Sequence, residues 1–266
     1  MHKLVRQVRF SLNPFMDKDK LGYNSYVSKP TGEGLSLFFE LGIELLGTID
    51  SSTGFLVNVV DIDKQVREQV VPVFSTSIRT HYRAGKEVSF LDLIKLLGLC
   101  RQKLAGSFPA AKLSRLNLKL NPFRQIAIDS EADKMVYFSE KFEFAATHIL
   151  WNNDFTEQRN IDVFGKCANP SGHGHNYIVE VTVKTPASGD FSIAEFERTV
   201  DKELIRLVDH RNLNEDVDFF NMTNPTMENI AVFAWEKLVG KLNKQMLHCV
   251  TIWESERACC SYTGPE

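Results

Sequence analysis

The sequence predicts an α+β protein built from two domains that share one plan. Segments in which apolar residues alternate with polar ones, as in half-buried strands, are interspersed with segments of helical periodicity. The order strand, strand, helix, helix, strand occurs once in each half of the chain. A length of 266 residues suits two domains of this size, because single domains commonly have about 100–200 residues.

The first half begins with an alternating strand and a polar loop through Gly22, Pro30 and Gly34. A turn at 51–54 separates the second strand from the first helix. The expected elements are strands over residues 4–12 and 35–43, helices over 62–71 and 90–104, a strand over 113–120, and a possible final strand over 125–129.

The second half repeats this order. Its first strand ends at His148, a polar loop spans 151–172, and Thr226 precedes a segment with apolar residues at helical spacing. The expected elements are strands over 135–147 and 176–184, a turn with Pro186 and Gly189, helices over 193–208 and 227–242, a strand over 249–254, and its continuation after a break over 258–262.

The repeated order indicates duplication of a whole domain, with the junction at 129–134. We therefore expect a first domain over 1–130 and a second over 131–266. Two unrelated α+β domains are the alternative. The residue types with distinctive chemistry lie in the second half, since residues 3–80 contain neither Cys nor His. The first domain is thus expected to be a degenerate copy without the metal and catalytic motifs.

Composition is typical of a soluble globular protein, with 43% hydrophobic and 24% charged residues. A net charge of -3 gives no support for nucleic acid or a membrane surface as a partner. No window is apolar enough to span a bilayer, and residues 1–10 lack the apolar core of a signal peptide. The five cysteines form no Cys-x-x-Cys motif, which suits a reducing compartment. We expect a cytoplasmic protein.

The segment from Cys167 to Tyr177 indicates a metal site. His173 and His175 are two residues apart before a β-branched segment, and a strand directs such residues to one face. His148, at the end of the preceding strand, is the expected third ligand. Three neutral imidazoles leave one tetrahedral position open, the arrangement of catalytic zinc, although imidazole also suits other transition metals. A single histidine more often caps an element or lies on the surface.

Cys167 is a candidate for an accessible thiolate. It lies in a loop rich in Gly, Asn and Pro, beside Lys166 and near the expected dication, and both charges would lower the pKa of its thiol. A buried, unreactive thiol is the alternative. Cys249, Cys259 and Cys260 lie in strand-like segments, and we expect them in the core.

Other candidates carry carboxylates and imidazoles. Asp209 could fix the tautomer of His210 in a proton relay, or the pair could simply end a helix. Glu254, at the end of a strand, could bind the amidine-like edge of a ligand or be a solvated acid. Thr226 and Glu228 are further candidates, and the alternative for both is that they only form the start of a helix.

Five motifs in this order resemble the 6-pyruvoyl-tetrahydropterin synthase family. The resemblance covers about residues 134–264 and does not extend by motif to residues 1–130. The motifs lie at Phe142 to His148, Cys167 to Tyr177, Leu207 to Asn214, Asn224 to Asn229, and Ile252 to Ser255.

The resemblance implies a T-fold, an antiparallel four-stranded sheet with two helices on one face, which oligomerises into a barrel. It implies that His148, His173 and His175 hold Zn2+, that Cys167 abstracts a proton, and that Asp209 and His210 relay protons. Glu254 would anchor the pterin ring, with Thr226 and Glu228 near it. The reaction would be loss of triphosphate from 7,8-dihydroneopterin triphosphate.

Two alternatives accompany this resemblance. One is 6-carboxy-tetrahydropterin synthase of the queuosine pathway, although the five-residue gap between Cys167 and His173 favours the 6-pyruvoyl type. The other is a pterin-binding protein without catalysis. Family sites lie at subunit interfaces, so a degenerate first domain in a neighbour's place could leave the site incomplete. The tandem plan also resembles urate oxidase, another T-fold with two repeats per chain.

Overall fold

A computed structural model describes residues 1–15, 36–130, 135–188, 191–242 and 246–265. The chain divides into two compact units. Unit 1 comprises Met1–Phe138 with Pro186–Asp190, and unit 2 comprises Ser139–Thr185 with Phe191–Glu266. The predicted junction at 129–134 falls largely on residues 131–134, which lie outside the described residues, and the split at residue 130 stays a prediction.

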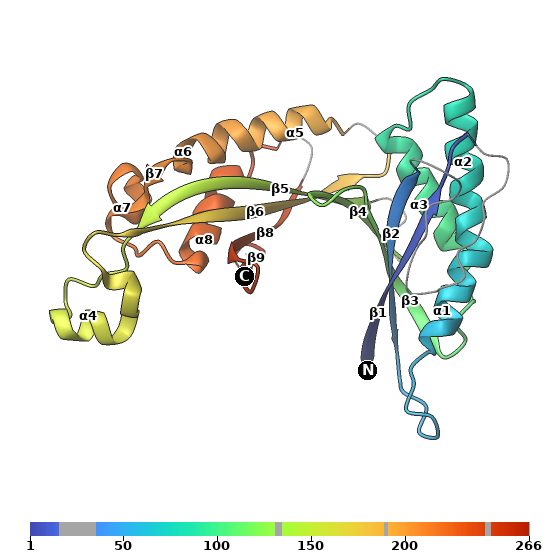
Figure 1. Cartoon of the computed structure of the whole chain (residues 1–266), viewed down its shortest axis with the longest axis horizontal. Coiled ribbons are helices and arrows are strands. Elements are labelled where there is room, and N and C mark those ends of the chain that lie inside the picture. Colours follow the sequence, from blue (N-terminus) through green and yellow to red (C-terminus); the bar gives the residue numbers. More distant parts are fainter. Residues whose placement is uncertain (16–35, 131–134, 189–190, 243–245, 266) are drawn as a thin grey trace. The chain divides into compact units, whose positions relative to one another are not determined.

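Unit 1 contains four strands in chain order, β1-β2-β3-β4, with antiparallel neighbours (Figure 1). Alternation places Val8, Phe10 and Leu12 of β1 in the core, where each is at most 2% exposed. The bounds are His2–Leu12 for β1, Leu37–Gly47 for β2, Ala111–Lys119 for β3 and Arg124–Asp129 for β4. All four predicted strands are present, the possible last one included. Residue 35, the predicted start of the second strand, lies outside the described residues.

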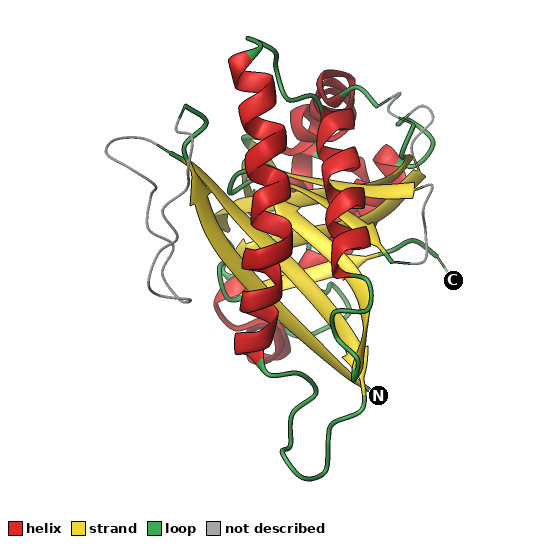
Figure 2. Ribbon diagram, turned by 90° about the vertical axis from the view of Figure 1, so that its right-hand side faces the viewer, coloured by secondary structure: helices red, strands yellow, loops and turns green. Residues whose placement is uncertain are grey.

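The helices of unit 1 cover one face of this sheet (Figure 2). The first helical segment is longer than the predicted 62–71: α1 (Val59–Gln65), a π-helical turn η1 (Val66–Val70) and α2 (Val71–Arg83) follow one another. Proline lacks the N–H that a helix interior uses, so Pro72 is an unfavourable residue for the continuation of a helix. Here Pro72 occupies the first turn of α2, where that N–H is not required. The second helix, α3 (Phe90–Leu104), has the predicted bounds and begins at the capping box of Ser89 and Asp92.

Unit 2 has the strand order β5-β6-β8-β9. The bounds are Met135–His148 for β5, His173–Pro186 for β6, Met246–Ser255 for β8 and Ala258–Tyr262 for β9. The prediction that 258–262 continues the preceding strand is wrong. The chain reverses after Ser255, and β9 pairs antiparallel with β8, with Trp253 opposite Cys259. A two-residue strand, β7 (Arg211–Asn212), pairs parallel with β5.

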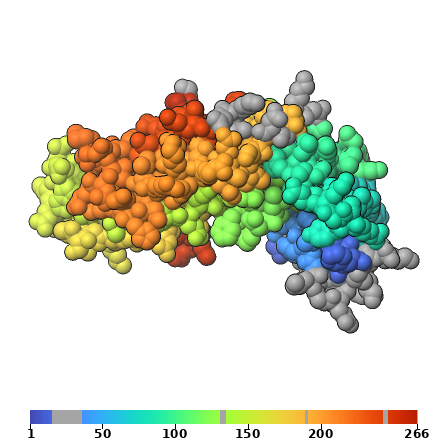
Figure 3. Space-filling model, turned by 90° about the horizontal axis from the view of Figure 1, so that it is seen from above, coloured from blue at the N-terminus to red at the C-terminus, as the bar shows by residue number. Residues whose placement is uncertain are grey.

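The helices of unit 2 differ from the prediction mainly at their ends. The predicted helix 193–208 is present as α5 (Ile193–Val200), a π-helical turn η3 (Asp201–Ile205) and α6 (Arg206–Val208), and it lies along the molecular surface (Figure 3). The second helix, α8 (Met227–Leu238), stops before the predicted residue 242, since Gly240 has a φ of 74° that no right-handed helix accommodates.

Short elements inside predicted loops were missed. The expected loop 151–172 contains α4 (Glu157–Phe164), capped by Thr156, and the 3₁₀ turn η2 (Gly165–Ala168). Two further short elements, α7 (Leu213–Asp216) and η4 (Asp218–Asn221), precede α8. The α+β class is as predicted. Among the described residues, no helix combines the length and apolar character that crossing a membrane requires.

Candidate active site

Three histidines converge at one end of the unit 2 sheet. His148 is the last residue of β5, and His173 and His175 alternate on the neighbouring strand β6. The Nε2 atoms of His148 and His173 are 3.0 Å apart, and the ring centroids of His173 and His175 are 4.7 Å apart. The strand positions of these residues therefore bring the three predicted ligands together.

Glu254 joins this cluster. Its Oε1 lies 3.0 Å from Nε2 of His175 and 3.7 Å from Nε2 of His148. One potential ligand atom from each of the four residues lies within 4.8 Å of all the others. The sequence indicated a carboxylate at a strand end, but not that the β6–β8 register, with Ile178 opposite Trp253, would place it beside the His-Gly-His segment.

The backbone carbonyl of Pro225 orients the imidazole of His148. Nδ1 of His148 lies 2.8 Å from this oxygen and donates to it, since a carbonyl can only accept. The unprotonated Nε2 is then left to face the cluster, as in metal-bound histidines whose other nitrogen is held by an acceptor. Burial lowers the pKa of His148, and likewise that of His175, which favours the neutral form that binds metals.

The donor set fits a zinc ion. Nε2 of His175 is buried and has no hydrogen-bond partner among the described residues, a costly state for a polar atom. A cation bound between the imidazoles would satisfy this nitrogen. Imidazole nitrogens and one carboxylate oxygen are ligands that zinc accepts, and three nitrogens leave a position for the substrate.

Glycines on both sides of His173 permit close packing of the two strands. Gly172 has a φ of 66°, and a Cβ there would lie 3.3 Å from the backbone oxygen of His148. A Cβ on Gly174 would lie 3.3 Å from Cγ2 of Thr147. Any larger residue at these positions would press against β5, so the glycines help to fix the spacing between His148 and the two histidines of β6.

Cys167 lies in the turn η2, half-buried, and its carbonyl accepts a hydrogen bond from the backbone N–H of Leu150 at 2.9 Å. This bond joins the thiol segment to the residues that follow His148. Burial raises the pKa of the Cys167 thiol, and the negative charge of Glu254 raises it further. The expectation that Lys166 lowers this pKa is therefore wrong for the protein without a cation.

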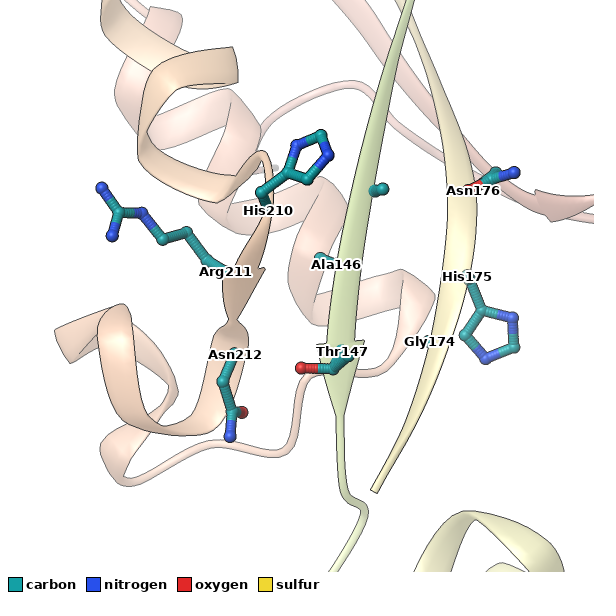
Figure 4. A pocket seen from close by; sticks show the side chains of 9 residues that line it. Ala146, Thr147, Gly174, His175, Asn176, His210, Arg211 and Asn212 are labelled. Atoms are coloured by element: carbon teal, nitrogen blue, oxygen red, sulfur yellow. The ribbon is translucent and has the colours of Figure 1, made fainter. Parts of the chain in front are cut away.

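Asp209 and His210 form a pair outside the metal cluster, and His210 lies on the other side of β5 from the imidazole of His175 (Figure 4). Nδ1 of His210 lies 3.0 Å from Oδ1 of Asp209, and the side chain of His210 is 83% exposed. The chain thus pairs these two residues without bringing them into its own metal cluster. His210 borders a pocket of about 450 Å³, which is also lined by Ala145, Ala146, Thr147, Gly174, His175, Asn176, Arg211 and Asn212.

Backbone strain marks His210. Its φ of 56° is the only positive value among the described residues other than glycine. Such a conformation costs about 1–3 kcal/mol and persists where surrounding contacts impose it. Here the N–H of His210 donates to the carbonyl of Ala145 at 2.6 Å, and Oδ1 of Asp209 accepts from the N–H of the same residue at 3.0 Å. The cluster of contacts around Ala145 therefore holds the exposed imidazole in place.

The 6-pyruvoyl tetrahydrobiopterin synthase of Drosophila melanogaster is 35% identical to this chain over 136 residues, which are 49% of this chain and 81% of the fly protein. The chain belongs to the 6-pyruvoyl tetrahydropterin synthase family. The family model, described as 6-pyruvoyl tetrahydropterin synthase, matches residues 137–265. The human 6-pyruvoyl tetrahydrobiopterin synthase is 35% identical over 130 residues, 47% of this chain and 90% of the human protein. The solved structure of the Caenorhabditis elegans 6-pyruvoyl tetrahydropterin synthase has 35% sequence identity and a TM-score of 0.46, covering 49% of this chain and 96% of that one.

Within this family region, Thr226 and Glu228 lie outside the metal cluster. Thr226 caps α8, because its hydroxyl accepts from the N–H of Asn229 at 3.4 Å. Glu228 is exposed in the first turn of α8, where a carboxylate interacts favourably with the helix dipole. Both positions agree with the helix-start alternative, and a role near the pterin is left to the proposal below.

Proposed function

We propose that this chain is a zinc-dependent 6-pyruvoyl-tetrahydropterin synthase-like lyase that eliminates triphosphate from 7,8-dihydroneopterin triphosphate. The single observation that carries the proposal is the convergence of His148, His173, His175 and Glu254 within the segment that matches the family. The thiol of Cys167 is near enough for the charge of Glu254 to shift its pKa. Metal ligands beside a thiol suit removal of a proton next to a polarised oxygen.

We infer that Nε2 atoms of His148, His173 and His175 hold the zinc ion. When bound, zinc would act as a Lewis acid toward the side-chain oxygens of the substrate and acidify the adjacent C–H bond. The burial that favours neutral imidazoles supports this ligand set. Glu254 is then available for the substrate, where its carboxylate would accept hydrogen bonds from the N–H groups of the pterin ring. Thr226 and Glu228 would lie close to the ring.

Cys167 would serve as the proton-abstracting base. Its thiolate takes the proton from the acidified carbon, the electron pair of that C–H bond forms a carbon–carbon double bond, and breakage of the C–O bond releases triphosphate. Because burial and Glu254 raise the pKa of this thiol, a base at neutral pH needs the nearby cation. The thiol would therefore be active only in the zinc-loaded protein.

Asp209 and His210 would relay protons in the site of a neighbouring copy. This assignment is supported by the exposure of the His210 imidazole and by its strained backbone, which serve no purpose in the metal cluster of the same chain. It also implies a homo-oligomer, which we propose to be a T-fold barrel. A neighbour that supplies the relay would make the site complete.

We further propose that residues 1–130 are a degenerate T-fold repeat and residues 131–266 the catalytic domain. Corresponding features support this. Each unit has a π-helical turn in the helical segment that follows its second strand, at Val66–Val70 and Asp201–Ile205. Each also has a register shift where its second strand pairs with the next strand of the sheet: the pairing skips Ser114 of β3 after Glu44 of β2, and it skips His248 of β8 after Thr182 of β6. Irregularities at matching places are not expected of two unrelated domains.

A stacked aromatic pair extends this correspondence. The rings of Phe10 and Phe39 have centroids 5.4 Å apart, and those of Phe144 and Tyr177 are 5.0 Å apart. Phe39 and Tyr177 each lie five residues before the residue of their strand at which the register shifts, Glu44 and Thr182. Aligning these pairs puts Pro14 at the position of His148, and Leu37 at the position of His175. Neither side chain can bind a metal, which agrees with a copy that has no site.

The test is incubation of zinc-loaded protein with 7,8-dihydroneopterin triphosphate, with triphosphate release measured and the product identified by mass. A product of the 6-pyruvoyl type supports the proposal, and a 6-carboxy product would assign the alternative enzyme. Binding of the pterin without triphosphate release would indicate a non-catalytic protein. Cys167→Ala is the matched variant: zinc content should persist while turnover falls about 10²- to 10⁴-fold, the usual loss for a general base.

A further inference from the structure

The segment that carries Asp209 and His210 is fastened to β5 along its whole length. The N–H of Ala145 donates to the side-chain carboxylate of Asp209, its carbonyl accepts from the N–H of His210, and β7 continues the contact by pairing Ala146 with Arg211 and Thr147 with Asn212. The segment thus runs beside the last residues of β5, directly up to the ligand His148. Its register on β5 decides where the His210 imidazole lies.

Asn214 closes the far end of this contact. Its Oδ1 accepts from the N–H of Ile149 at 2.8 Å, and its Nδ2 donates to the carbonyl of the same residue at 3.0 Å. One side-chain amide therefore satisfies both backbone groups of the residue next to His148. The two bonds satisfy the backbone of Ile149 as a neighbouring strand would, beyond the point where β5 and β7 stop pairing. They can form in only one register of the segment on β5.

We propose that Asn214 is a positioning residue for the Asp209–His210 pair. It acts by locking the segment 209–214 in register on β5, with Ala145 at one end and Ile149 at the other. The proposal rests on the relay role proposed above. A carboxamide is required, because no other short side chain presents a donor and an acceptor to one peptide unit in this way.

The strain at His210 explains why a lock is needed. A non-glycine residue with positive φ is strained, and relaxation of His210 would carry the exposed ring away. Near the ring, the hydrogen bonds to Ala145 oppose this, but β7 is only two residues long. Asn214, which lies in α7 three residues after this short strand begins, adds the side-chain contact to the residue that follows β5. Misplacement of a catalytic group by about 1 Å can cost about 10²-fold in rate.

Asn224 provides a matched control. Its Oδ1 accepts from the N–H of Trp151 at 2.9 Å, so it also fastens the chain after His148 by a side-chain amide. Among the described residues, its hydrogen bonds go to Trp151, Asn229 and Thr226, and none goes to the segment 209–214. Substituting Asn224 therefore loosens the same loop without releasing the relay pair.

Asn214→Asp is the conservative variant, since its carboxylate keeps an acceptor for Ile149 N–H but loses the donor.

The experiment compares zinc-loaded wild type, Asn214→Ala, Asn214→Asp, Asn224→Ala, His210→Ala and the double variant Asn214→Ala/His210→Ala. We expect Asn214→Ala to lower kcat about 10- to 100-fold with zinc content and KM kept, and Asn214→Asp to fall between it and wild type. In the His210→Ala background the same substitution should cost less than about 3-fold, because a residue that acts through His210 has nothing left to position. Equal losses in both backgrounds, or equal losses in Asn224→Ala, would overturn the proposal.

Hydrogen exchange gives a readout that does not depend on activity. The amide of His210 should exchange at least about 10-fold faster in Asn214→Ala than in wild type or Asn224→Ala, because its bond to Ala145 opens more often. Unchanged protection of this amide overturns the positioning role. Full activity of His210→Ala would instead refute the relay, and the exchange rates would still decide whether Asn214 holds the segment.

Discussion

Nε2 of His175 lies 3.0 Å from Oε1 of Glu254, yet it forms no hydrogen bond to this or any other described residue. A buried nitrogen beside a carboxylate but outside hydrogen-bond geometry is the arrangement expected of two groups that share one cation. Two roles for Glu254 follow from this contact. The carboxylate of Glu254 could be a further ligand of the metal. Alternatively, it could bind the pterin, with the metal held by the three imidazoles alone.

Glu254→Gln separates these roles. We expect zinc content to stay near one ion per chain and KM for the pterin triphosphate to rise at least about 10-fold, since the amide cannot accept from two ring N–H groups as a carboxylate does. Metal analysis and steady-state kinetics measure both quantities. A loss of zinc in step with activity would show that Glu254 is a ligand and would refute its role as anchor.

Each of the three imidazoles should be needed for zinc. His173→Ala, a change at the middle of the cluster, should lower zinc to well below one ion per chain after dialysis against a weak chelator, because two nitrogens bind zinc far less tightly than three. His2→Ala, an exposed histidine at the start of β1, is the control and should keep its zinc. Full zinc content in the His173→Ala protein would contradict the ligand set.

The sequence was sufficient for those parts of the site that depend on local order. The alternation of His173 and His175 on a strand follows from the period of two, and His148 followed from the end of a neighbouring strand. The family resemblance added the roles. The environment of Glu254 could not be predicted, because it depends on the register between β6 and β8, which two segments about 70 residues apart do not encode locally.

The short elements show a second limit. The helix α4 has only eight residues, so its apolar periodicity is brief, and the polar composition of 151–172 indicated a loop. What stabilises it is tertiary: the fully buried amide of Asn160 accepts from the N–H of Asn152 and donates to backbone carbonyls around it. A Thr156 cap was visible in the sequence and could have suggested the helix start.

Asp209 should make stability depend on pH in the acid range. The hydrogen bond from Ala145 N–H, followed by the contact with His210, holds the pKa of this carboxyl below its usual value of 3.8. Because the folded-state pKa is the lower one, the ionised carboxylate stabilises the fold above about pH 3.8, and the contribution disappears as the pH falls through the folded-state value. Asn at this position keeps an acceptor for Ala145 but cannot ionise.

The measurement is urea unfolding of wild type and Asp209→Asn at several pH values. The stability difference in favour of wild type should be constant near neutral pH and shrink below about pH 4. Working with the difference removes the contribution of the other carboxylates, which both proteins share. A difference that grows as the pH falls would reverse the sign and refute the inferred environment of Asp209.

The cysteines should differ sharply in reactivity, and not in the way the sequence suggested. Cys259 was expected in the core, but it is exposed on β9, whereas Cys100 is fully buried in α3. Burial raises the pKa of Cys100 to about 12, so only about one molecule in 10⁴ carries its thiolate at pH 8 even before access is considered.

A disulfide reagent at this pH should therefore modify Cys259 quickly and leave Cys100 untouched until the protein unfolds. Cys259→Ala should abolish the fast phase, and Cys100→Ala should leave it unchanged. Rapid labelling of Cys100 in the folded protein, located by peptide mass, would mean that α3 opens far more often than a helix with a fully buried apolar face should.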